Sequence, residues 1–379
     1  MQHKLTARWL IPFPIVASGG HGTIYAHMQR MVADGYNCIA CVDLRHVSSP
    51  LSSRRTRLRE LQALLTKKGI DVEFGHEAIT RDADIAVATS WQTAFDVAAS
   101  TAPYKAYFIQ DYEPWFFPHG DHYLRAEYSY RLGLTPIVLG RWLANKIASL
   151  SNQTPFVLPF TVDSNIYKQT PSSQRSRAIC YLHQPEKPRR CAALAQAALQ
   201  IVRTQRPDIE IWSYGSKREP GLETRHFGVL TRNACADLYN KAAVGLCISA
   251  SNPSRIPFEM AACGLPVVDI DAENTRADAL MEAFLLTPAD PASLAAAMIR
   301  AVDEGLAAEL NGSPAVGNSI EGETTSELDA SALAFRQMLR ATPIATASHI
   351  AGGMEITSSA WLRLRHRLIK AYIAFFENS

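Results

Sequence analysis

The segment of residues 249–271, SASNPSRIPFEMAACGLPVVDID, combines a carboxylate with a predicted helix start. We expect the helix to begin at Pro257, because proline lacks an N–H group at a position where that group would have no partner within the helix, and to stop at Gly264. Such a start presents free N–H groups and a partial positive charge, which suit a diphosphate. We expect Glu259 in the first turn, able to accept a hydrogen bond from a sugar hydroxyl; the alternative is a simple helix cap. The residues of the helix start are Ser254, Arg255, Ile256 and Pro257.

A second group of reactive side chains lies in residues 107–120, YFIQDYEPWFFPHG. Asp111 and Glu113 follow a predicted strand and stand among tyrosine, tryptophan and phenylalanine residues. Carboxylates accept hydrogen bonds from sugar hydroxyls, and aromatic faces cover the apolar C–H surface of a sugar ring. A carboxyl group beside aromatic surface can also have the raised pKa that a general base needs. The alternative is a surface loop that Asp111 caps, with the aromatic residues in the core.

Two other loops carry groups that suit phosphates. Residues 184–190, QPEKPRR, place Lys187 and Arg189 between a strand and a helix, where cations and a helix start act on the same charge. A solvated basic loop is the alternative. Residues 19–23, GGHGT, follow the first strand as a glycine-rich turn. Their spacing is not that of a dinucleotide-binding G-x-G-x-x-G, so we reject NAD binding.

Apolar runs of strand length alternate with helical patterns along most of the chain. This alternation is typical of a parallel sheet with helices on both faces, and ligands bind at the carboxyl ends of its strands. We therefore expect an α/β protein with two Rossmann-like doubly wound domains that face a central cleft. The predicted limits are residues 1–165 for the first domain, 166–342 for the second, closed by a helix at 328–339, and 343–379 for a tail with a helix at 359–376.

The motif of residues 249–268 resembles the donor-binding motif of GT-B glycosyltransferases, E-G-F-G-x-P-x-x-E-A-M-A-x-G-x-P-V-V. The form NPSRIPFEMAACGLPVV is most similar to bacterial rhamnosyltransferases that use TDP-rhamnose to build cell-surface polysaccharides. The phrases QDYEP at residues 110–114 and FTVDSNIY in the predicted linker resemble the same family. The likeness covers about residues 10–340. The chain departs from the family pattern at Ser251, where the first acidic residue is expected.

The resemblance implies that the second domain binds a nucleotide-sugar donor. Glu259 would bind the ribose, and Arg189, with Lys187 second, would bind the donor diphosphate. The phrase GVLT, which contains Leu230, matches the place where the family holds the nucleotide base through backbone groups. The glycine-rich segment at Gly20 would face the cleft near the donor phosphates and the acceptor.

The resemblance also implies that the first domain binds the acceptor and supplies the catalytic groups. Asp111 would be the general base, with Glu113 and His21 as acceptor-site candidates. The implied reaction transfers L-rhamnose from TDP-rhamnose to a hydroxyl of a glycan or lipid-linked glycan, with no cofactor and no bound metal. The alternatives are a transferase for a UDP- or GDP-sugar, a sugar-nucleotide epimerase, and a non-catalytic scaffold of a polysaccharide assembly complex.

The composition excludes several other classes of protein. The chain has 379 residues and a net charge of +2, which gives no overall nucleic-acid signature. Seven scattered cysteines indicate a reducing compartment, and no run of 18 apolar residues predicts a spanning helix. We expect a cytoplasmic protein without a signal peptide. The tail helix 359–376 has apolar and basic stripes that fit packing on the first domain or contact with the inner face of the cell membrane.

Overall fold

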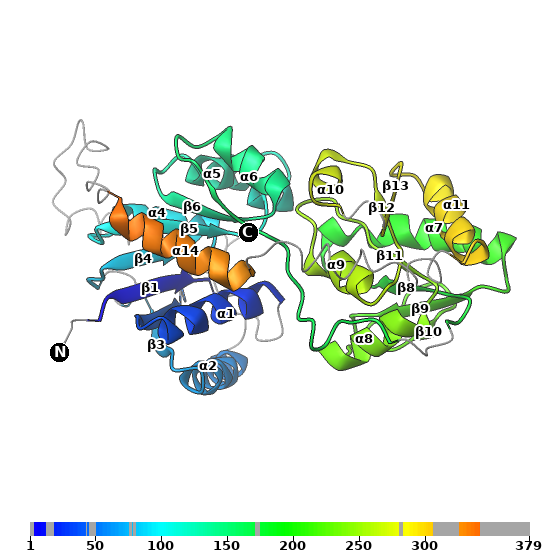
Figure 1. Cartoon of the computed structure of the whole chain (residues 1–379), viewed down its shortest axis with the longest axis horizontal. Coiled ribbons are helices and arrows are strands. Elements are labelled where there is room, and N and C mark those ends of the chain that lie inside the picture. The colour runs from blue at the N-terminus through cyan, green and yellow to red at the C-terminus, as the bar shows by residue number, and fades with distance from the viewer. Residues whose placement is uncertain are drawn as a thin grey trace, which may run out of the picture. The chain divides into compact units, whose positions relative to one another are not determined.

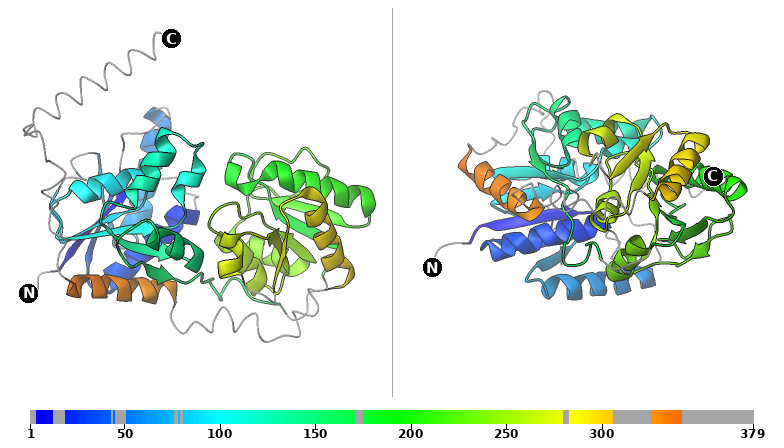
Figure 2. Two further views of the ribbon diagram at one scale, coloured as in Figure 1. Left: turned by 90° about the horizontal axis from the view of Figure 1, so that it is seen from above. Right: turned by 45° about the vertical axis from the view of Figure 1, so that its right-hand side comes forward.

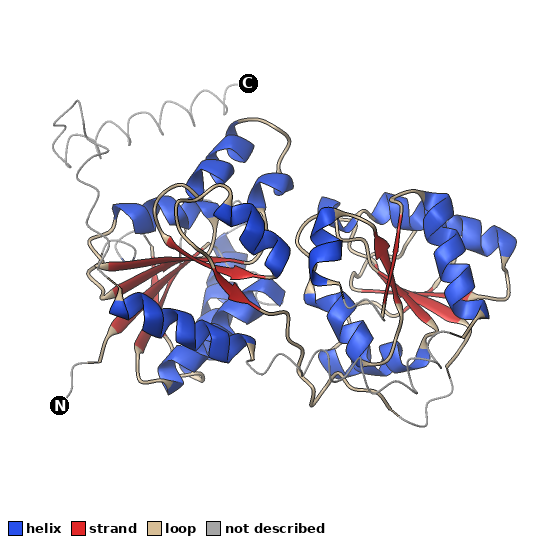
Figure 3. Cartoon of the chain, turned by 45° about the horizontal axis from the view of Figure 1, so that its top comes forward, coloured by secondary structure: helices blue, strands red, loops and turns tan. Residues whose placement is uncertain are grey.

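The computed structural model describes residues 4–12, 19–42, 44, 51–75, 78, 81–170, 175–279, 283–305 and 326–341. In this part of the chain two parallel β-sheets form, each with helices on both faces (Figures 1 and 3). The predicted α/β architecture with two doubly wound sheets is confirmed. The predicted tail helix at residues 359–376 lies outside the described residues. Among the helices that are described, none combines the length and the hydropathy needed to cross a membrane.

The first sheet has seven strands in the order β3-β2-β1-β4-β5-β6-β7, all parallel. Alternate residues of a strand face opposite sides of a sheet. In β1, Trp9 and Ile11 lie in one hydrophobic core and Leu10 lies in the other, because helices cover both sides. The strands are β1 (Thr6–Ile11), β2 (Asn37–Val42), β3 (Asp71–Phe74), β4 (Ile85–Ala88), β5 (Tyr104–Ile109), β6 (Thr135–Leu139) and β7 (Phe156–Leu158). The helices between them are α1 (Gly19–Ala33), α2 (Leu51–Thr66), α4 (Trp91–Ala99), α5 (Asp121–Ser129) and α6 (Arg141–Ala148), with a 3₁₀ turn, η1 (Glu113–Phe116), before α5.

The second sheet has six parallel strands in the order β10-β9-β8-β11-β12-β13. Val268 and Ile270 of β12 pack in one core with α7 and α11, and Val267 packs in the opposite core. The strands are β8 (Ala178–Leu182), β9 (Glu210–Tyr214), β10 (Arg225–His226), β11 (Val244–Leu246), β12 (Val267–Ile270) and β13 (Phe284–Thr287). The helices are α7 (Ala192–Gln205), α8 (Arg232–Lys241), α9 (Arg255–Ala262), α10 (Glu273–Asp278) and α11 (Pro291–Asp303), with a 3₁₀ turn, η2 (Pro188–Arg190), before α7.

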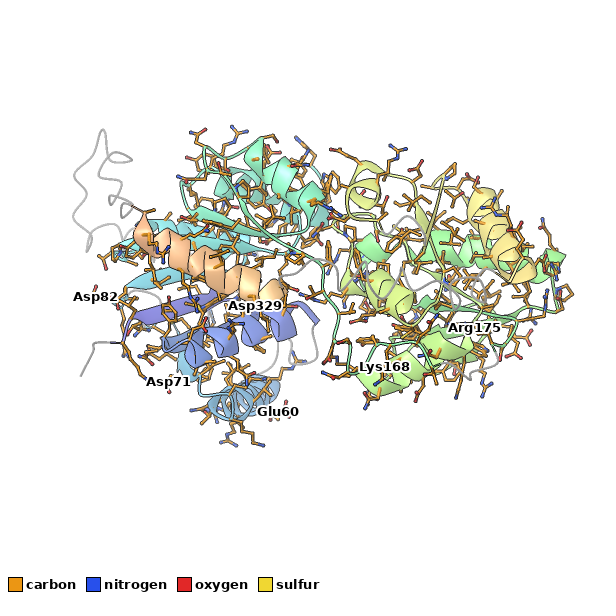
Figure 4. The ribbon with its side chains drawn as sticks, viewed as in Figure 1. Glu60, Asp71, Asp82, Lys168, Arg175 and Asp329 are labelled. Carbon is orange, nitrogen blue, oxygen red and sulfur yellow. The ribbon has the colours of Figure 1, made fainter. Side chains whose placement is uncertain are left out.

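Helix α14 (Glu327–Arg340) packs on the first sheet (Figure 2). The rings of its Phe335 and of Trp9 in β1 have centroids 5.8 Å apart. Its Asp329, labelled in Figure 4, makes an ion pair with Arg30 of α1. The prediction that a helix at residues 328–339 closes the second domain is therefore wrong. An apolar stripe predicts that a helix is buried, but it does not specify which sheet the helix covers.

Two predicted helix starts are wrong by several residues. Helix α9 begins at Arg255, two residues before Pro257, and Glu259 consequently lies beyond the first turn. Proline is tolerated at this third position because the first four N–H groups of a helix have no partner within the helix. Helix α1 begins at Gly19, so the predicted glycine-rich turn is its first turn. Gly264 ends α9 as expected, at φ 67°, and Gly35 ends α1 in the same way, at φ 95°.

The C-terminal ends of α8 and α9 share one half-buried cation. The guanidinium of Arg175, labelled in Figure 4, donates to the carbonyl oxygens of Tyr239 and Ala242 at the end of α8. It also donates to the carbonyl oxygens of Cys263 and Gly264 at the end of α9, at 2.8 and 2.9 Å. A cation at this place compensates the partial negative charge of two helix ends. Arg175 therefore fixes the position of α9, which carries the predicted anion site.

Candidate active site

A cavity of ≈ 460 Å³ is lined by residues that follow the strands of both sheets. Its volume is within the range of roughly 300–1,000 Å³ that ligand pockets have. Pro257 and Leu230 were predicted in the donor site, but they are not among the residues that line the cavity. The predicted site residues that do line it are Gly20, His21, Asp111, Glu113, Lys187, Arg189, Ser254, Arg255, Ile256 and Glu259.

Asp111 follows β5 and contacts the loop that precedes α9. Its Oδ1 accepts hydrogen bonds from the backbone N–H groups of Tyr112 and Asn252, both at 2.9 Å, and its Oδ2 accepts one from the Ser251 hydroxyl at 3.0 Å. Nε of Arg189 lies 3.9 Å from Oδ2. Burial raises the pKa of Asp111, although these donors and the Arg189 charge oppose the rise. The side chain is 17% exposed, so a ligand in the cavity can reach it.

Glu113 lies in η1, and its carboxylate is held at the start of α4. Oε1 accepts a hydrogen bond from the Tyr107 hydroxyl at 3.0 Å, and Oε2 accepts one from the backbone N–H of Trp91 at 3.1 Å. Burial raises the pKa of Glu113 to about 7, although these two hydrogen bonds act in the opposite direction. A carboxyl group with such a pKa can gain or lose a proton near neutral pH, as a general acid or base does.

Gly20 and His21 lie in the first turn of α1, where both line the cavity. The carbonyl oxygen of Gly20 accepts a hydrogen bond from the side-chain amide of Gln110 at 3.2 Å, which links α1 to the end of β5. Burial lowers the pKa of His21, and the carbonyl of Pro12 only partly offsets this effect. The His21 ring is therefore neutral at neutral pH, and it can donate or accept a hydrogen bond.

Three cations of the loop after β8 line the cavity. The guanidinium of Arg189 lies over the Phe116 ring, 4.5 Å from its centroid, and Lys187 donates to the side chain of Gln184 at 3.1 Å. Burial lowers the pKa of both Lys187 and Arg189. Arg190, which the sequence analysis did not select, donates to the hydroxyl of Ser254 at 3.0 Å. Ser254 is the N-cap of α9, so Arg190 is the cation in direct contact with the predicted anion-binding helix start.

Arg255 lines the cavity, but its side chain is held by Thr161 and by Glu327 of α14. It donates to the carbonyl oxygen of Thr161 at 2.9 Å and to Oε1 of Glu327 at 2.6 Å. The same carboxylate oxygen lies 2.8 Å from Nε2 of His27 in α1. Burial alone would raise the pKa of Glu327, but the His27 hydrogen bond and the charge of Arg255 lower it to about 2. The contribution of Arg255 to an anion site is therefore its backbone N–H at the start of α9.

The Glu259 side chain is half-buried and lines the cavity from the second turn of α9. Burial raises its pKa, and the charges of Arg255 and Arg232 and a hydrogen bond from Tyr167 oppose the rise. A carboxylate at this depth can accept a hydrogen bond from a hydroxyl group of a ligand seated at the helix start. The prediction placed Glu259 one turn too early, but the structure brings it to the same cavity as Asp111 and Glu113.

The buried carboxylate of Asp269 positions the loop that precedes α9, and sequence reasoning missed it. It accepts hydrogen bonds from the backbone N–H of Ser249 at 2.8 Å and from the Ser249 hydroxyl at 2.7 Å. The side-chain amide of Asn274 donates to the carbonyl oxygens of Ser249 and Ser251. Burial raises the pKa of Asp269 to about 6, although the two hydrogen bonds from Ser249 oppose the rise. An aspartate inside the apolar strand run VVDI was the signal that could have identified it.

Asn252 and Asp278 join the domain of the second sheet to the domain of the first sheet. The side-chain amide of Asn252 donates to the carbonyl oxygens of Gln110 and Leu139, both at 2.9 Å. Asp278 of α10 accepts hydrogen bonds from the backbone N–H groups of Arg141 and Trp142, the first residues of α6, at 2.8 and 3.1 Å. The residue at the N-cap of α6 is a glycine, which has no side chain to cap the helix.

The remaining predictions concern Pro257, Leu230 and metals. Pro257 is buried within α9, because the helix starts earlier than expected. Leu230 packs at the edge of the core that contains Trp212, so the predicted contact of its backbone with a nucleotide base stays a prediction. In the described residues, no three His, Cys, Asp or Glu side chains are grouped as a metal site would require.

A family model matches part of the region that forms the second sheet. Residues 177–299 match the family model described as WsaF, C-terminal domain. The chain is also 32% identical over 203 residues to the O-antigen biosynthesis protein RfbC of Myxococcus xanthus. This match covers 51% of the chain but only 16% of the length of RfbC.

Comparison with solved structures covers most of the chain. The Anabaena protein Alr3699/HepE in complex with UDP-glucose is similar with a TM-score of 0.65 and 14% identity, over 89% of this chain and 100% of HepE. Sucrose-phosphate synthase from Thermosynechococcus elongatus is similar with a TM-score of 0.61 and 12% identity, over 89% of this chain and 98% of the synthase. At such low identity the likeness concerns the fold. With two parallel, doubly wound sheets and this likeness, the chain has the GT-B fold of glycosyltransferases.

Proposed function

We propose that the protein transfers a sugar from a nucleotide-sugar to a hydroxyl group of a glycan during surface polysaccharide synthesis. One observation carries this proposal. A single cavity joins the start of α9, with Arg190 and Glu259 beside it, to the carboxylates of Asp111 and Glu113. The first set of groups suits a nucleoside diphosphate, and the second suits the proton transfer from an attacking hydroxyl.

The donor diphosphate is placed at the N-terminus of α9. Backbone N–H groups of Ser254 and Arg255, together with Arg190 and Arg189, stabilise the charge of the leaving diphosphate without a metal ion. Lys187 lines the same cavity and adds a third cation. Glu259 accepts a hydrogen bond from a ribose hydroxyl. We expect Glu259→Ala to weaken donor binding by about tenfold or more, because a hydrogen bond to a charged group contributes roughly 1.5–3 kcal/mol.

Asp111 is the proposed general base. Among the described residues, only the Ser251 hydroxyl donates a hydrogen bond to its Oδ2, which therefore retains a lone pair for an acceptor hydroxyl. Glu113 and His21 are proposed to orient the acceptor from the same side of the cavity. Because a positioned base contributes about 10²–10⁴ to the rate, Asp111→Asn should reduce turnover by that factor while donor binding remains.

The donor is proposed to be TDP-rhamnose, on the resemblance of NPSRIPFEMAACGLPVV to rhamnosyltransferases. A UDP-sugar is the second candidate, because the similar HepE structure is a complex with UDP-glucose. The likeness of part of the chain to an O-antigen biosynthesis protein supports a glycan acceptor, free or lipid-linked. Nucleotide-sugars are made inside the cell, so we place the reaction in the cytoplasm, at or near the inner face of the membrane.

The test is nucleotide release from TDP-rhamnose, UDP-glucose and a GDP-hexose by the full chain in the presence of an oligosaccharide that accepts the sugar. Release from TDP-rhamnose alone, lost in Asp111→Asn, is the expected result. Release only from UDP-glucose or the GDP-hexose would replace the donor assignment. Binding of no nucleotide and release from none would leave the non-catalytic scaffold as the better reading and would overturn the proposal.

A further inference from the structure

A group of exposed apolar side chains lies next to the cavity. Seven large hydrophobic side chains are exposed in the described part of the chain, and four of them fall between residues 115 and 128. These four, the aromatic shelf, are Trp115, Phe116, Leu124 and Tyr128, which are 42%, 37%, 53% and 52% exposed. Single exposed apolar residues are ordinary, whereas four on two elements that pack together, η1 and α5, indicate a binding surface.

The aromatic shelf reaches the cavity at Phe116. Phe116 both belongs to the shelf and lines the cavity, where Arg189 lies over its ring. Leu124 and Tyr128 are four residues apart on α5, so they lie on the same face of that helix. Helix α5 packs against η1, which carries Trp115 and Phe116. A chain-like ligand with one end in the cavity would therefore pass over Phe116 and Trp115 toward α5.

The rings of the shelf are held in place by the core beneath them. The Trp115 ring has its centroid 5.2 Å from that of Trp142 and 5.4 Å from that of Tyr112, which it meets edge to face. Tyr128 stacks on Phe95 with centroids 6.3 Å apart. Rings that are already ordered lose little entropy when a flat ligand packs on them, so the entropy cost of binding such a ligand is small.

The charges around the shelf are mixed. Arg125 lies over the rings of Trp91 and Phe95, and Lys146 lies over those of Tyr112 and Trp115. Asp121 and Glu127 on α5 carry the opposite sign. A surface that docks on anionic lipid is dominated by Lys and Arg. Aromatic faces interspersed with donors and acceptors of both signs instead fit a sugar chain, whose rings have apolar faces and hydroxyl edges.

We propose that the aromatic shelf binds the acceptor as an oligosaccharide of several sugar units, whose terminal hydroxyl enters the cavity over Phe116. This inference rests on the proposed function and adds the class of acceptor: a growing glycan chain and not a single sugar. The acceptor end reaches Asp111 and Glu113, and the preceding sugars lie on Trp115, Leu124 and Tyr128.

The test measures binding of tetrasaccharides of rhamnose, glucose and mannose and of the corresponding methyl glycosides to the full chain. At least one tetrasaccharide should bind tighter than its methyl glycoside by about tenfold or more, since stacked rings add free energy unit by unit. The double variant Leu124→Ser/Tyr128→Ser should remove most of that difference, and Trp115→Ala should reduce it. Leu333→Ala, which truncates a 51% exposed side chain on α14, is the matched control and should not change it.

Two other outcomes would overturn the inference. The first is that every tetrasaccharide binds no tighter than its methyl glycoside. The second is that the double variant loses binding to phosphatidylglycerol vesicles and keeps glycan binding; this result would make the shelf a membrane-docking surface. Binding of TDP-rhamnose and UDP-glucose, measured on the same samples, separates the two proposals. Failure of the wild-type chain to bind any nucleotide-sugar contradicts the proposed function, whereas nucleotide binding without the chain-length effect contradicts only the shelf.

Discussion

At the scale of single residues, the position of the acidic residue expected at 251 is occupied by Ser251, and the nearby carboxylate is that of Asp111 from the first domain. The glycosyltransferase pattern that the chain resembles has an acidic residue at the position of Ser251. In the structure the Ser251 hydroxyl donates to Oδ2 of Asp111, which follows β5 of the first sheet. A second carboxylate at position 251 would lie against Asp111 and repel it. A serine at this position instead donates a hydrogen bond to Asp111 and leaves that carboxylate as the acid of the site.

The pH dependence of turnover should report the ionisation of Glu113. Burial raises its pKa to about 7, so the carboxylate form gains population as the pH rises through neutrality. The ionised group accepts hydrogen bonds more strongly than the neutral acid. We therefore expect turnover to increase between about pH 6 and 8, with an apparent pKa near that of Glu113. Glu113→Gln should abolish this step in a pH–rate profile; an unchanged profile would assign the step to another group.

Arg190 should contribute to diphosphate binding more than the sequence indicated. Its guanidinium donates to Ser254 at the N-cap of α9, whereas Arg189 lies over Phe116. Arg190→Gln should weaken binding of a nucleoside diphosphate by roughly 10- to 100-fold, as loss of a hydrogen bond to a charged group does. Calorimetric titration with the diphosphate and the corresponding nucleoside checks this. Equal losses for both ligands would show that the variant disturbs the fold and not the anion site.

At the scale of elements, Arg175 connects the C-terminal ends of α8 and α9. It donates to four carbonyl oxygens, two from α8 and two from α9. Arg175→Met should lower the free energy of unfolding by about 3 kcal/mol or more, because several buried carbonyl groups lose their partner. Urea unfolding measures the change. Arg177→Met is the matched control: Arg177 is exposed and pairs with Asp208 and Asp303 at the surface, so its loss should change stability little.

Glu327 connects three helices and should make the protein sensitive to acid. Its pKa is lowered to about 2 in the folded chain from an ordinary value of 4.5. A lowered pKa stabilises the fold above the ordinary value, and this contribution is lost as the pH falls from about 4.5 to 2. The loss amounts to roughly 3 kcal/mol, at about 1.4 kcal/mol for each pKa unit. Glu327→Gln should show a shallower decrease of thermal stability over that pH range.

At the scale of the whole molecule, the sheets were predictable from local pattern, whereas the contacts between distant segments were not. The runs that become β6 and β12 are apolar and bounded by turn residues, which is the local pattern that predicts a buried strand. Helix α14 was assigned to the wrong sheet, since its partners Trp9 and Arg30 lie some 300 residues earlier. Asp111 and Glu259 were found through motifs. Arg190 and Asp269 were missed because their roles depend on Ser254 and Ser249, which only the fold brings to them.

Asp278 caps the start of α6, so hydrogen exchange of the capped amides reports whether the two domains separate. The N–H groups of Arg141 and Trp142 are protected only while α10 stays in place, because the N-cap residue itself is a glycine. A motion that parts the two sheets would expose both amides to deuterium. Saturation with a nucleotide-sugar should then slow their exchange by about tenfold, because a bound donor that contacts both domains raises the free energy of opening by about 1.4 kcal/mol. In Asp278→Ala the same two amides should exchange at a rate that the donor no longer changes.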